Sequence, residues 1–152
     1  DNDLWVLPLD GGEPREFLAT GASEVDARFS PEGSWVTYLS DQSGQYEVYI
    51  RPAAGGGEVQ VSAAGGVNPE WNAAADELFF TRSREILAVD FRPGDARPVG
   101  AQRKILDWPR STRAAFLLPA PDGQRFLVSS FGDVQGSNSI LAILNWNRDP
   151  QR

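Results

Sequence analysis

The chain has 152 residues, 41% of them hydrophobic, with five Trp, eight Phe, 15 Gly and 11 Pro, a composition typical of a globular chain with many turns. It contains no Cys and no His, which excludes disulfides, thiolate zinc sites and the usual catalytic triads. The net charge of -7 argues against nucleic acid as a partner.

The charge is distributed unevenly along the chain. Residues 1–76 carry 13 acidic and 3 basic side chains, whereas residues 77–152 carry 8 acidic and 11 basic ones. This polarity would favour head-to-tail contact between copies, although two differently solvated surfaces are the simpler interpretation. No apolar run reaches the ~18 residues of a membrane helix, so we expect no membrane contact from this segment. Because the sequence begins at Asp1 and lacks Met, we expect a piece of a longer protein.

Short runs of β-branched and aromatic residues, separated by glycine and proline turns, predict a chain of antiparallel strands. The runs fall into four groups: 3–8 and 15–18; 25–29, 35–39, 47–50 and 58–61; 68–71, 78–80, 85–91 and 103–106; and 114–118, 126–128 and 140–144. The groups divide the chain into the end of one unit at 1–24, full units at 25–66 and 67–112, an incomplete unit at 113–146 and a tail at 147–152.

One turn recurs at the same place in these units. Pro31-Glu32-Gly33 returns as Pro121-Asp122-Gly123 at an offset of 90, and the segment at Trp71 aligns with the first full unit at an offset of 42. In the middle unit the turn is reduced to residues 72–76 and its glycine is missing. A recurring unit of four strands predicts β-propeller blades, so we expect an all-β partial propeller of about three to four blades, each a four-stranded antiparallel sheet. A single β-sandwich is the alternative, but it would not explain the recurring turn.

Three motifs in the first full unit resemble those of a known family. Residues 29–33 (Phe-Ser-Pro-Glu-Gly), 40–44 (Ser-Asp-Gln-Ser-Gly) and 48–50 (Val-Tyr-Ile) follow one another as in blades of the TolB-like, WD-repeat-like propeller family. Residues 121–128 and 144–146 resemble the C-terminal blades of bacterial proteins that append such a propeller to a serine/threonine kinase or a similar signalling module. The resemblance departs at Trp71, where the Pro-Asp-Gly turn is lost, and in blade number, because the family's full propeller has six or seven blades.

The resemblance implies that the motif residues shape turns and fill the space between blades, with no catalytic role and no cofactor. It also implies a bacterial protein. The compartment stays open, with the periplasmic or extracytoplasmic part of a membrane-anchored protein as one option.

The candidate ligand-binding residues are Asp26, Arg28, Glu70 and Arg113. They fall on or near the innermost strands, which line the central channel of a propeller. Polar side chains there can meet a peptide, or they can satisfy one another through ion pairs. The sequence does not decide between the two, and it predicts no catalytic residue and no metal ligand.

Other conspicuous residues have structural interpretations. We expect the turn carboxylates Glu32, Asp76 and Asp122 to accept hydrogen bonds from backbone N–H groups. Asp41 with Ser43 lacks the alternating ligands of a calcium loop. Packing between sheets is a better explanation than a stacking platform for Trp35, Trp71, Phe79, Phe80, Phe116 and Phe126. Trp108 is expected to be partly exposed, and a solvated outer edge is expected for the basic residues Arg103, Lys104, Arg110 and Arg113.

These observations favour a non-catalytic module that binds a protein or peptide, as the sensory or scaffolding part of a larger bacterial signalling protein. An accessory propeller that gates a hydrolase is the alternative, and a sugar-cleaving propeller is a weaker third option because no two carboxylates pair convincingly. Fewer than four blades leave uncovered faces and strand edges, so we also expect self-association, in which two copies complete one propeller.

Overall fold

The computed structural model describes residues 1–107, 113–121 and 125–131, and every regular element in these ranges is a β-strand. All strand pairs are antiparallel, and strands that follow one another within a sheet are always hydrogen-bonded neighbours. No helix that could span a membrane occurs in the described ranges.

The strands form two pairs and two four-stranded sheets. The first pair consists of β1 (Leu4–Val6) and β2 (Arg15–Leu18). The first full sheet consists of β3 (Glu24–Phe29), β4 (Trp35–Ser40), β5 (Glu47–Pro52) and β6 (Val59–Gln60). The second full sheet consists of β7 (Val67–Trp71), β8 (Glu77–Arg82), β9 (Glu85–Asp90) and β10 (Arg103–Asp107). The last pair consists of β11 (Arg113–Pro119) and β12 (Phe126–Phe131).

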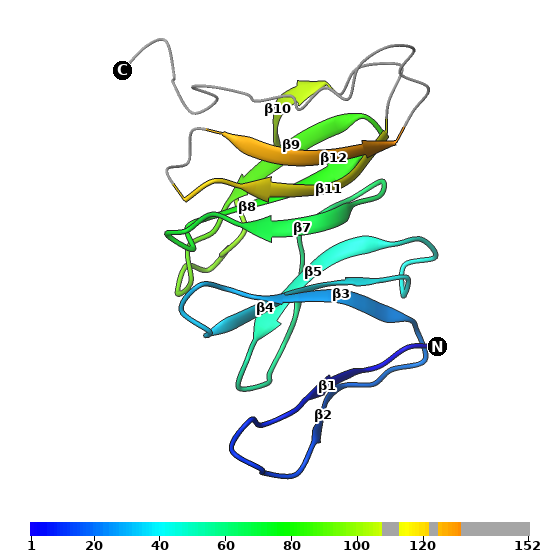
Figure 1. The fold of residues 1–152 in the computed structure, drawn as a ribbon, viewed down its shortest axis with the longest axis vertical. Helices are drawn as coiled ribbons and strands as arrows, with labels where there is room; N and C mark the ends of the chain where they lie inside the picture. Colours follow the sequence, from blue (N-terminus) through cyan, green and yellow to red (C-terminus); the bar gives the residue numbers. More distant parts are fainter. Residues whose placement is uncertain (108–112, 122–124, 132–152) are drawn as a thin grey trace.

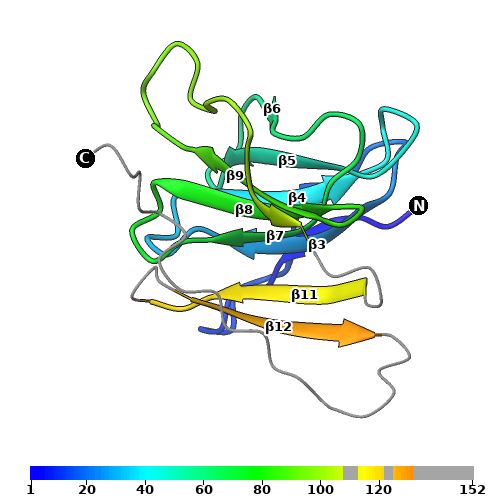
Figure 2. The ribbon, with the colours of Figure 1, turned by 90° about the horizontal axis from the view of Figure 1, so that it is seen from above.

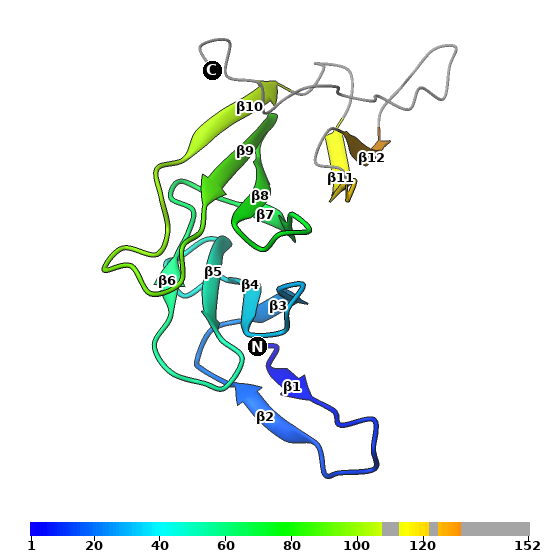
Figure 3. The ribbon, with the colours of Figure 1, turned by 90° about the vertical axis from the view of Figure 1, so that its left-hand side faces the viewer.

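The sheets are stacked one after another in chain order (Figure 1). From the side they follow an arc, with β3 and β7 towards its concave side and β6 on the opposite, convex side (Figure 3). The view from above shows the first full sheet running from β3 on one side to β6 on the other (Figure 2). This is the arrangement of successive blades in a β-propeller, with β3 and β7 as innermost strands.

The predicted all-β fold of four-stranded antiparallel sheets is confirmed, with small shifts at the strand ends. Several strands extend beyond the predicted runs, because backbone pairing continues past the apolar residues that reveal a strand in the sequence. Three runs are shorter than predicted: 3–8 and 58–61 shrink to β1 and β6, and 85–91 ends one residue early, since Phe91 forms an isolated bridge with Val99 instead. The predicted strand 140–144, the tail 147–152, Trp108 and most of the turn after Pro121 lie outside the described residues.

Successive side chains of β8 point to opposite faces of the sheet and enter two different cores. Phe80 is fully buried and packs with Ile50 of the preceding sheet. Phe79 packs on the other face with Leu117 and Phe126, and its ring meets that of Phe126 edge to face at 4.9 Å between centroids. Burial of each large apolar side chain contributes about 1.5–3 kcal/mol. The second full sheet is therefore stabilised by a neighbour on each face.

The aromatic residues predicted to pack between sheets do so wherever the structure describes their side chains. Trp71, Phe79, Phe80 and Phe126 are buried, and Trp35 packs partly buried against the first core. The side chain of Phe116 lies outside the description. The packing interpretation is thus confirmed for the described members of this group.

The recurring turn keeps one hydrogen-bond pattern in both full sheets. In the first, Ser30 Oγ accepts from Trp35 N–H at 3.0 Å, and Gly33 N–H donates to Ser30 O at 2.8 Å. In the second, Asn72 Oδ1 accepts from Glu77 N–H at 3.2 Å, and Ala75 N–H donates to Asn72 O at 3.2 Å. The turn that lost its glycine therefore retains its geometry.

The carboxylates in these turns accept hydrogen bonds from side chains, whereas backbone N–H groups were the predicted donors. The Ser30 hydroxyl donates to Glu32 at 2.9 Å, and the Asn72 side-chain amide donates to Asp76 at 2.6 Å. Ser30 and Asn72 themselves accept the backbone N–H groups, because their side chains stand at the start of the turn. The expectation that the carboxylates accept these groups is wrong for Glu32 and Asp76, and Asp122 lies outside the described residues.

Candidate functional site

The innermost strands of the two full sheets bring three of the four predicted site residues together. Arg28 on β3 pairs with Thr37 in the strand register, and Glu70 on β7 pairs with Phe79. Glu70 stands 42 residues after Arg28, and Phe79 stands 42 residues after Thr37. Arg28 and Glu70 therefore occupy the same position in successive blades, on the concave side of the arc, and Asp26 precedes Arg28 by two residues.

An ion-pair network joins these three side chains. Arg28 Nη2 lies 2.7 Å from Asp26 Oδ1, and Arg28 Nε lies 3.4 Å from Glu70 Oε1. Arg28 Nη1 also donates to Ala27 O at 3.0 Å. The Arg28 side chain is 44% exposed and that of Glu70 is 15% exposed. The guanidinium thus connects two blades while part of it stays open to solvent.

Burial raises the pKa of the Glu70 carboxyl above its ordinary value of 4.5. The positive charge of Arg28 opposes this shift, and the negative charge of Asp26 adds to it. Because two carboxylates share one guanidinium, the network retains a negative charge when both are ionised. The sequence left open whether these side chains pair or face a partner, and in the structure they pair with one another.

A β-bulge precedes both positions. The register of β3 and that of β7 shift just before Arg28 and Glu70. The residues in the two bulges, Asp26 and Asn68, each have a φ of 54°, in the left-handed region that Asp and Asn tolerate best after glycine. Asn68 Nδ2 also donates to Thr81 Oγ1 at 2.9 Å. A bulge redirects the side chains that follow it. The two bulges could have been recognised in the sequence, because Asp26 and Asn68 stand 42 residues apart, which is the offset between the two full blades.

The same position in the last strand pair carries an apolar side chain. Leu118 pairs with Leu127 in the register, 90 residues after Arg28 and Thr37, and it is 41% exposed. Arg113, the fourth predicted residue, begins β11, which contacts β7. The side chain of Arg113 lies outside the description. Sequence reasoning missed Leu118, although the offset of 90 between the recurring turns would have identified it.

The described residues offer no metal centre. No group of three or more potential His, Asp or Glu ligands occurs in the ranges that the structure describes. Asp41, which with Ser43 lacks the ligand pattern of a calcium loop, accepts a hydrogen bond from Ser23 N–H at 2.8 Å. Its carboxylate therefore fixes the segment that leads into β3.

The predicted basic edge lies on the outermost strand of the second full sheet. Arg103 on β10 forms an ion pair with Glu77, and Lys104 Nζ lies 3.0 Å from Asp107 Oδ2. The carboxylate of Asp107 raises the pKa of Lys104. These cations therefore have carboxylate partners, and Arg110 lies outside the described residues.

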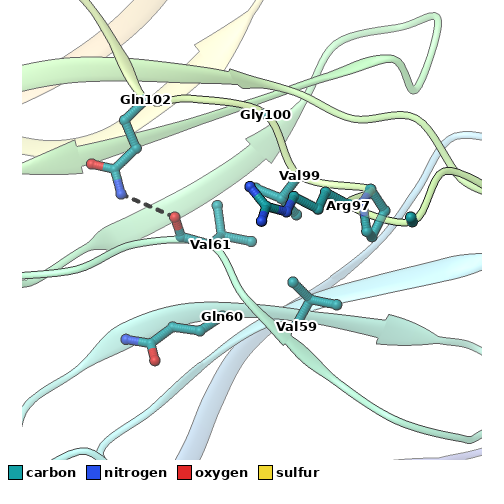
Figure 4. Close-up of a pocket in the computed structure, with 9 residues that line it drawn as sticks. Val59, Gln60, Val61, Arg97, Val99, Gly100 and Gln102 are labelled. Atoms are coloured by element: carbon teal, nitrogen blue, oxygen red, sulfur yellow. Dashed lines mark hydrogen bonds between the residues drawn. The ribbon is translucent and has the colours of Figure 1, made fainter.

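A groove that was not predicted from the sequence lies on the outer side of the blades. It is an open groove of about 570 Å³ between β6 with Val61 and the segment 96–102 (Figure 4). This segment belongs to the connection from β9 to β10, which spans residues 91–102, whereas the equivalent connection in the first full sheet spans residues 53–58. Gln102 Nε2 donates to Val61 O at 3.1 Å, so the two walls are tied at one end.

Comparison with known proteins gives one sequence relative and several solved structures of similar fold. No protein-family model matches the chain. The chain is 26% identical over 136 residues to Tricorn protease homolog 1 of Streptomyces coelicolor, an alignment that covers 82% of this chain and 12% of that protein. A TolB structure from Agrobacterium tumefaciens matches 89% of this chain and 48% of its own, with a TM-score of 0.65 and 18% identity. An acylaminoacyl peptidase of Pyrococcus horikoshii matches 79% of this chain and 19% of its own, with a TM-score of 0.56 and 18% identity.

These comparisons bear on the fold rather than on an activity. At this identity the solved structures support the architecture alone, and they include both TolB and a peptidase. The chain spans only 12% of its curated relative and less than half of the TolB structure. Together with the stacked antiparallel sheets, they establish that the chain is a partial β-propeller with the fold seen in TolB.

Proposed function

We propose that the chain is a non-catalytic propeller module that binds a protein or peptide partner on its concave side. The observation that carries this proposal is the variation at one repeated position. The two full blades keep the same turn and bulge, and the β11–β12 pair keeps the strand register, yet the equivalent inner position holds Arg28, then Glu70, then Leu118. Because this position does not have to be conserved between blades for the fold, a cation, an anion and an apolar group there are available for recognition.

The proposed setting is the sensory or scaffolding part of a larger bacterial signalling protein of the kinase-associated type. It is supported by the segments 121–128 and 144–146, which resemble the ends of such propellers. A propeller is well suited to such a role because its inner strands present side chains from several blades to one ligand.

Binding of the purified chain to an array of 15-residue peptides tests this function. Arg28→Ala should weaken the strongest interactions about five-fold, because a charge-assisted hydrogen bond at a partly exposed site contributes ~1 kcal/mol. Arg15→Ala, which removes an exposed guanidinium from β2, is the matched control and should leave binding unchanged. Hydrolysis of esters, peptides or glycosides by the chain would refute the non-catalytic assignment. Peptide affinities that are the same for Arg28→Ala and the wild type would refute the concave site.

An accessory propeller that gates a hydrolase or peptidase is the second candidate. The names of the sequence relative, a protease homolog, and of one structural neighbour, a peptidase, favour it. The complete reading frame that contains this sequence separates the two candidates. A kinase domain or a membrane helix in that frame supports the signalling module, whereas a hydrolase domain with a nucleophile elbow supports the gate.

A further inference from the structure

The outer groove has an unpaired strand edge along one wall. β6 is the last strand of its sheet in the described part of the chain. Val61 N–H donates to Val48 O at 2.8 Å, and residues in antiparallel pairs alternate between hydrogen-bonded and non-hydrogen-bonded positions. Gln60, which pairs with Tyr49, is therefore a non-hydrogen-bonded residue. Its backbone N–H and C=O point away from β5, to the free edge of the sheet.

The facing wall offers a second free backbone position. Val99 forms an isolated antiparallel bridge with Phe91. The hydrogen bonds of this bridge run through the neighbouring residues, from Gly100 N–H to Asp90 O at 2.9 Å and from Arg92 N–H to Pro98 O at 2.8 Å. Val99 thus turns its own N–H and C=O away from Phe91. Gln60 and Val99 both line the groove, on opposite walls (Figure 4).

One cation lies in the groove without a partner. Arg97 is exposed, and Figure 4 shows its guanidinium over the groove between Val61 and Val99. Within the described residues, Arg97 has neither an ion pair nor a side-chain hydrogen bond. The nearest acidic residue in sequence, Asp95, does not line the groove. Val59 and Val99, which pack partly buried against the first core, also line the groove and give it apolar surface.

We propose that this groove binds an extended acidic peptide segment of a partner protein by strand addition to β6. The peptide backbone bonds to the free N–H and C=O of Gln60, its apolar side chains cover Val59 and Val99, and an Asp or Glu side chain pairs with Arg97. The inference rests on the proposed binding role of the module, but it places a second binding surface on the side of the blades opposite Arg28 and Glu70. The long connection 91–102 builds this surface, and it has 12 residues where the connection 53–58 of the preceding blade has six.

An NMR titration of the ¹⁵N-labelled chain with two blocked five-residue peptides tests the groove. In one peptide Val alternates with Glu, and in the other Val alternates with Lys. The peptide concentration is raised to ~5 mM, so that millimolar dissociation constants can be measured. The Val/Glu peptide should shift the backbone amides of Gln60, Val61 and Val99, and it should bind at least about five-fold more tightly than the Val/Lys peptide, because one charge pair at this exposure is worth ~1 kcal/mol. Arg97→Glu should reverse this preference. Gln60→Pro removes the free N–H at an edge where proline is tolerated, and should weaken both peptides, whereas Gln60→Ala should weaken neither.

Each other outcome counts against the groove. Binding that is equal for both peptides, or insensitive to Arg97→Glu and Gln60→Pro, overturns strand addition at this site. Shifts confined to the amides around Arg28 and Glu70 overturn the groove but leave the proposed concave function standing. Shifts at Gln60 and Val99 that appear on concentrating the chain without peptide assign the groove to a second copy, and they likewise overturn the peptide assignment.

Discussion

Phe29 and Trp71 occupy the same position on the innermost strands of successive blades, yet Phe29 is 57% exposed and Trp71 only 7%. Trp71 packs edge to face against Phe91 at 5.2 Å between ring centroids, and Phe91 packs in the same way against Trp35 of the preceding blade at 5.0 Å. Phe91 thus covers Trp71 and joins it to the preceding blade. Phe29 follows the strand pair β1–β2 and lacks that cover.

We expect the chain to self-associate through this uncovered face. A large exposed aromatic at a position that is buried in the next blade favours burial against a second copy. Phe29→Ser should shift the molar mass measured by light scattering towards that of a monomer, whereas Leu9→Ser, in the exposed turn after β1, should not. High salt should also weaken an association of the acidic half with the basic half of another copy, since salt screens exposed charges. A monomer that persists at high concentration contradicts this expectation.

The contact between the two full blades depends on Phe91, which is buried between two indole rings. Phe91→Ala should lower the free energy of unfolding by about 3–5 kcal/mol, because it removes a large buried side chain and leaves a cavity. Phe91→Leu keeps most of the volume and should cost about 1 kcal/mol. Urea denaturation measures both changes, and Trp emission at longer wavelength in Phe91→Ala would report water beside Trp35 and Trp71. Equal losses for the two variants would show that the interface does not depend on packing volume.

The sequence was sufficient for the fold because the turn signals and the strand patterns agree from one unit to the next. One turn departs from this pattern in sequence and still keeps its geometry. The segment 72–76 lacks proline and glycine, yet Asn72 supplies the hydrogen-bond acceptor that Ser30 supplies in the first blade. Ala75 takes the left-handed conformation of Gly33, with a φ of 58° against 76°. Packing of the neighbouring strands enforces this conformation against the local preference of alanine.

These two turn positions make a matched pair of stability tests. An L-residue other than glycine loses about 1–2 kcal/mol in the left-handed conformation. Ala75→Gly should therefore stabilise the chain by roughly 0.5–1 kcal/mol, after the extra entropy of glycine in the unfolded chain is deducted. Gly33→Ala should destabilise it by about 1 kcal/mol, through strain alone, since nothing lies within 4 Å of an added Cβ. Thermal unfolding of both variants provides the measurement, and changes of the same sign would contradict the equivalence of the turns.

The candidate sites were less accessible to sequence reasoning than the fold. Asp26, Arg28 and Glu70 could be placed on inner strands, because the repeat fixes which strand of each blade is innermost. Their mutual pairing could not be predicted, since it depends on how far one blade is rotated against the next. The groove at Arg97 was hidden for another reason: its walls come from the connection 91–102 and from β6, and the repeat does not specify the path of such a connection.

The ion pair between neighbouring blades should make a modest contribution to stability. Arg28 is partly exposed and its Nε lies 3.4 Å from Glu70 Oε1, so Arg28→Ala should cost about 0.5–1 kcal/mol at neutral pH. The double variant Arg28→Ala with Glu70→Gln should recover part of this loss, because no buried charge is then left without a partner. Urea denaturation of the two single variants and the double variant gives the coupling energy. A coupling energy of zero would mean that the two side chains do not interact in solution.

Glu70 should also leave a signature in the pH dependence of stability. Burial raises its pKa in the folded chain above the ordinary value of 4.5. Between these two pKa values the folded chain holds a proton on Glu70 that the unfolded chain has released, so the contribution of Glu70 to the free energy of unfolding is greatest below pH 4.5 and falls as the pH rises through the folded pKa. Glu70→Gln imitates the protonated carboxyl, and its stability relative to the wild type should therefore increase with pH across this window. Urea titrations between about pH 4 and 7 measure the difference, and parallel profiles for the two proteins would show that the carboxyl is charged at no cost to folding.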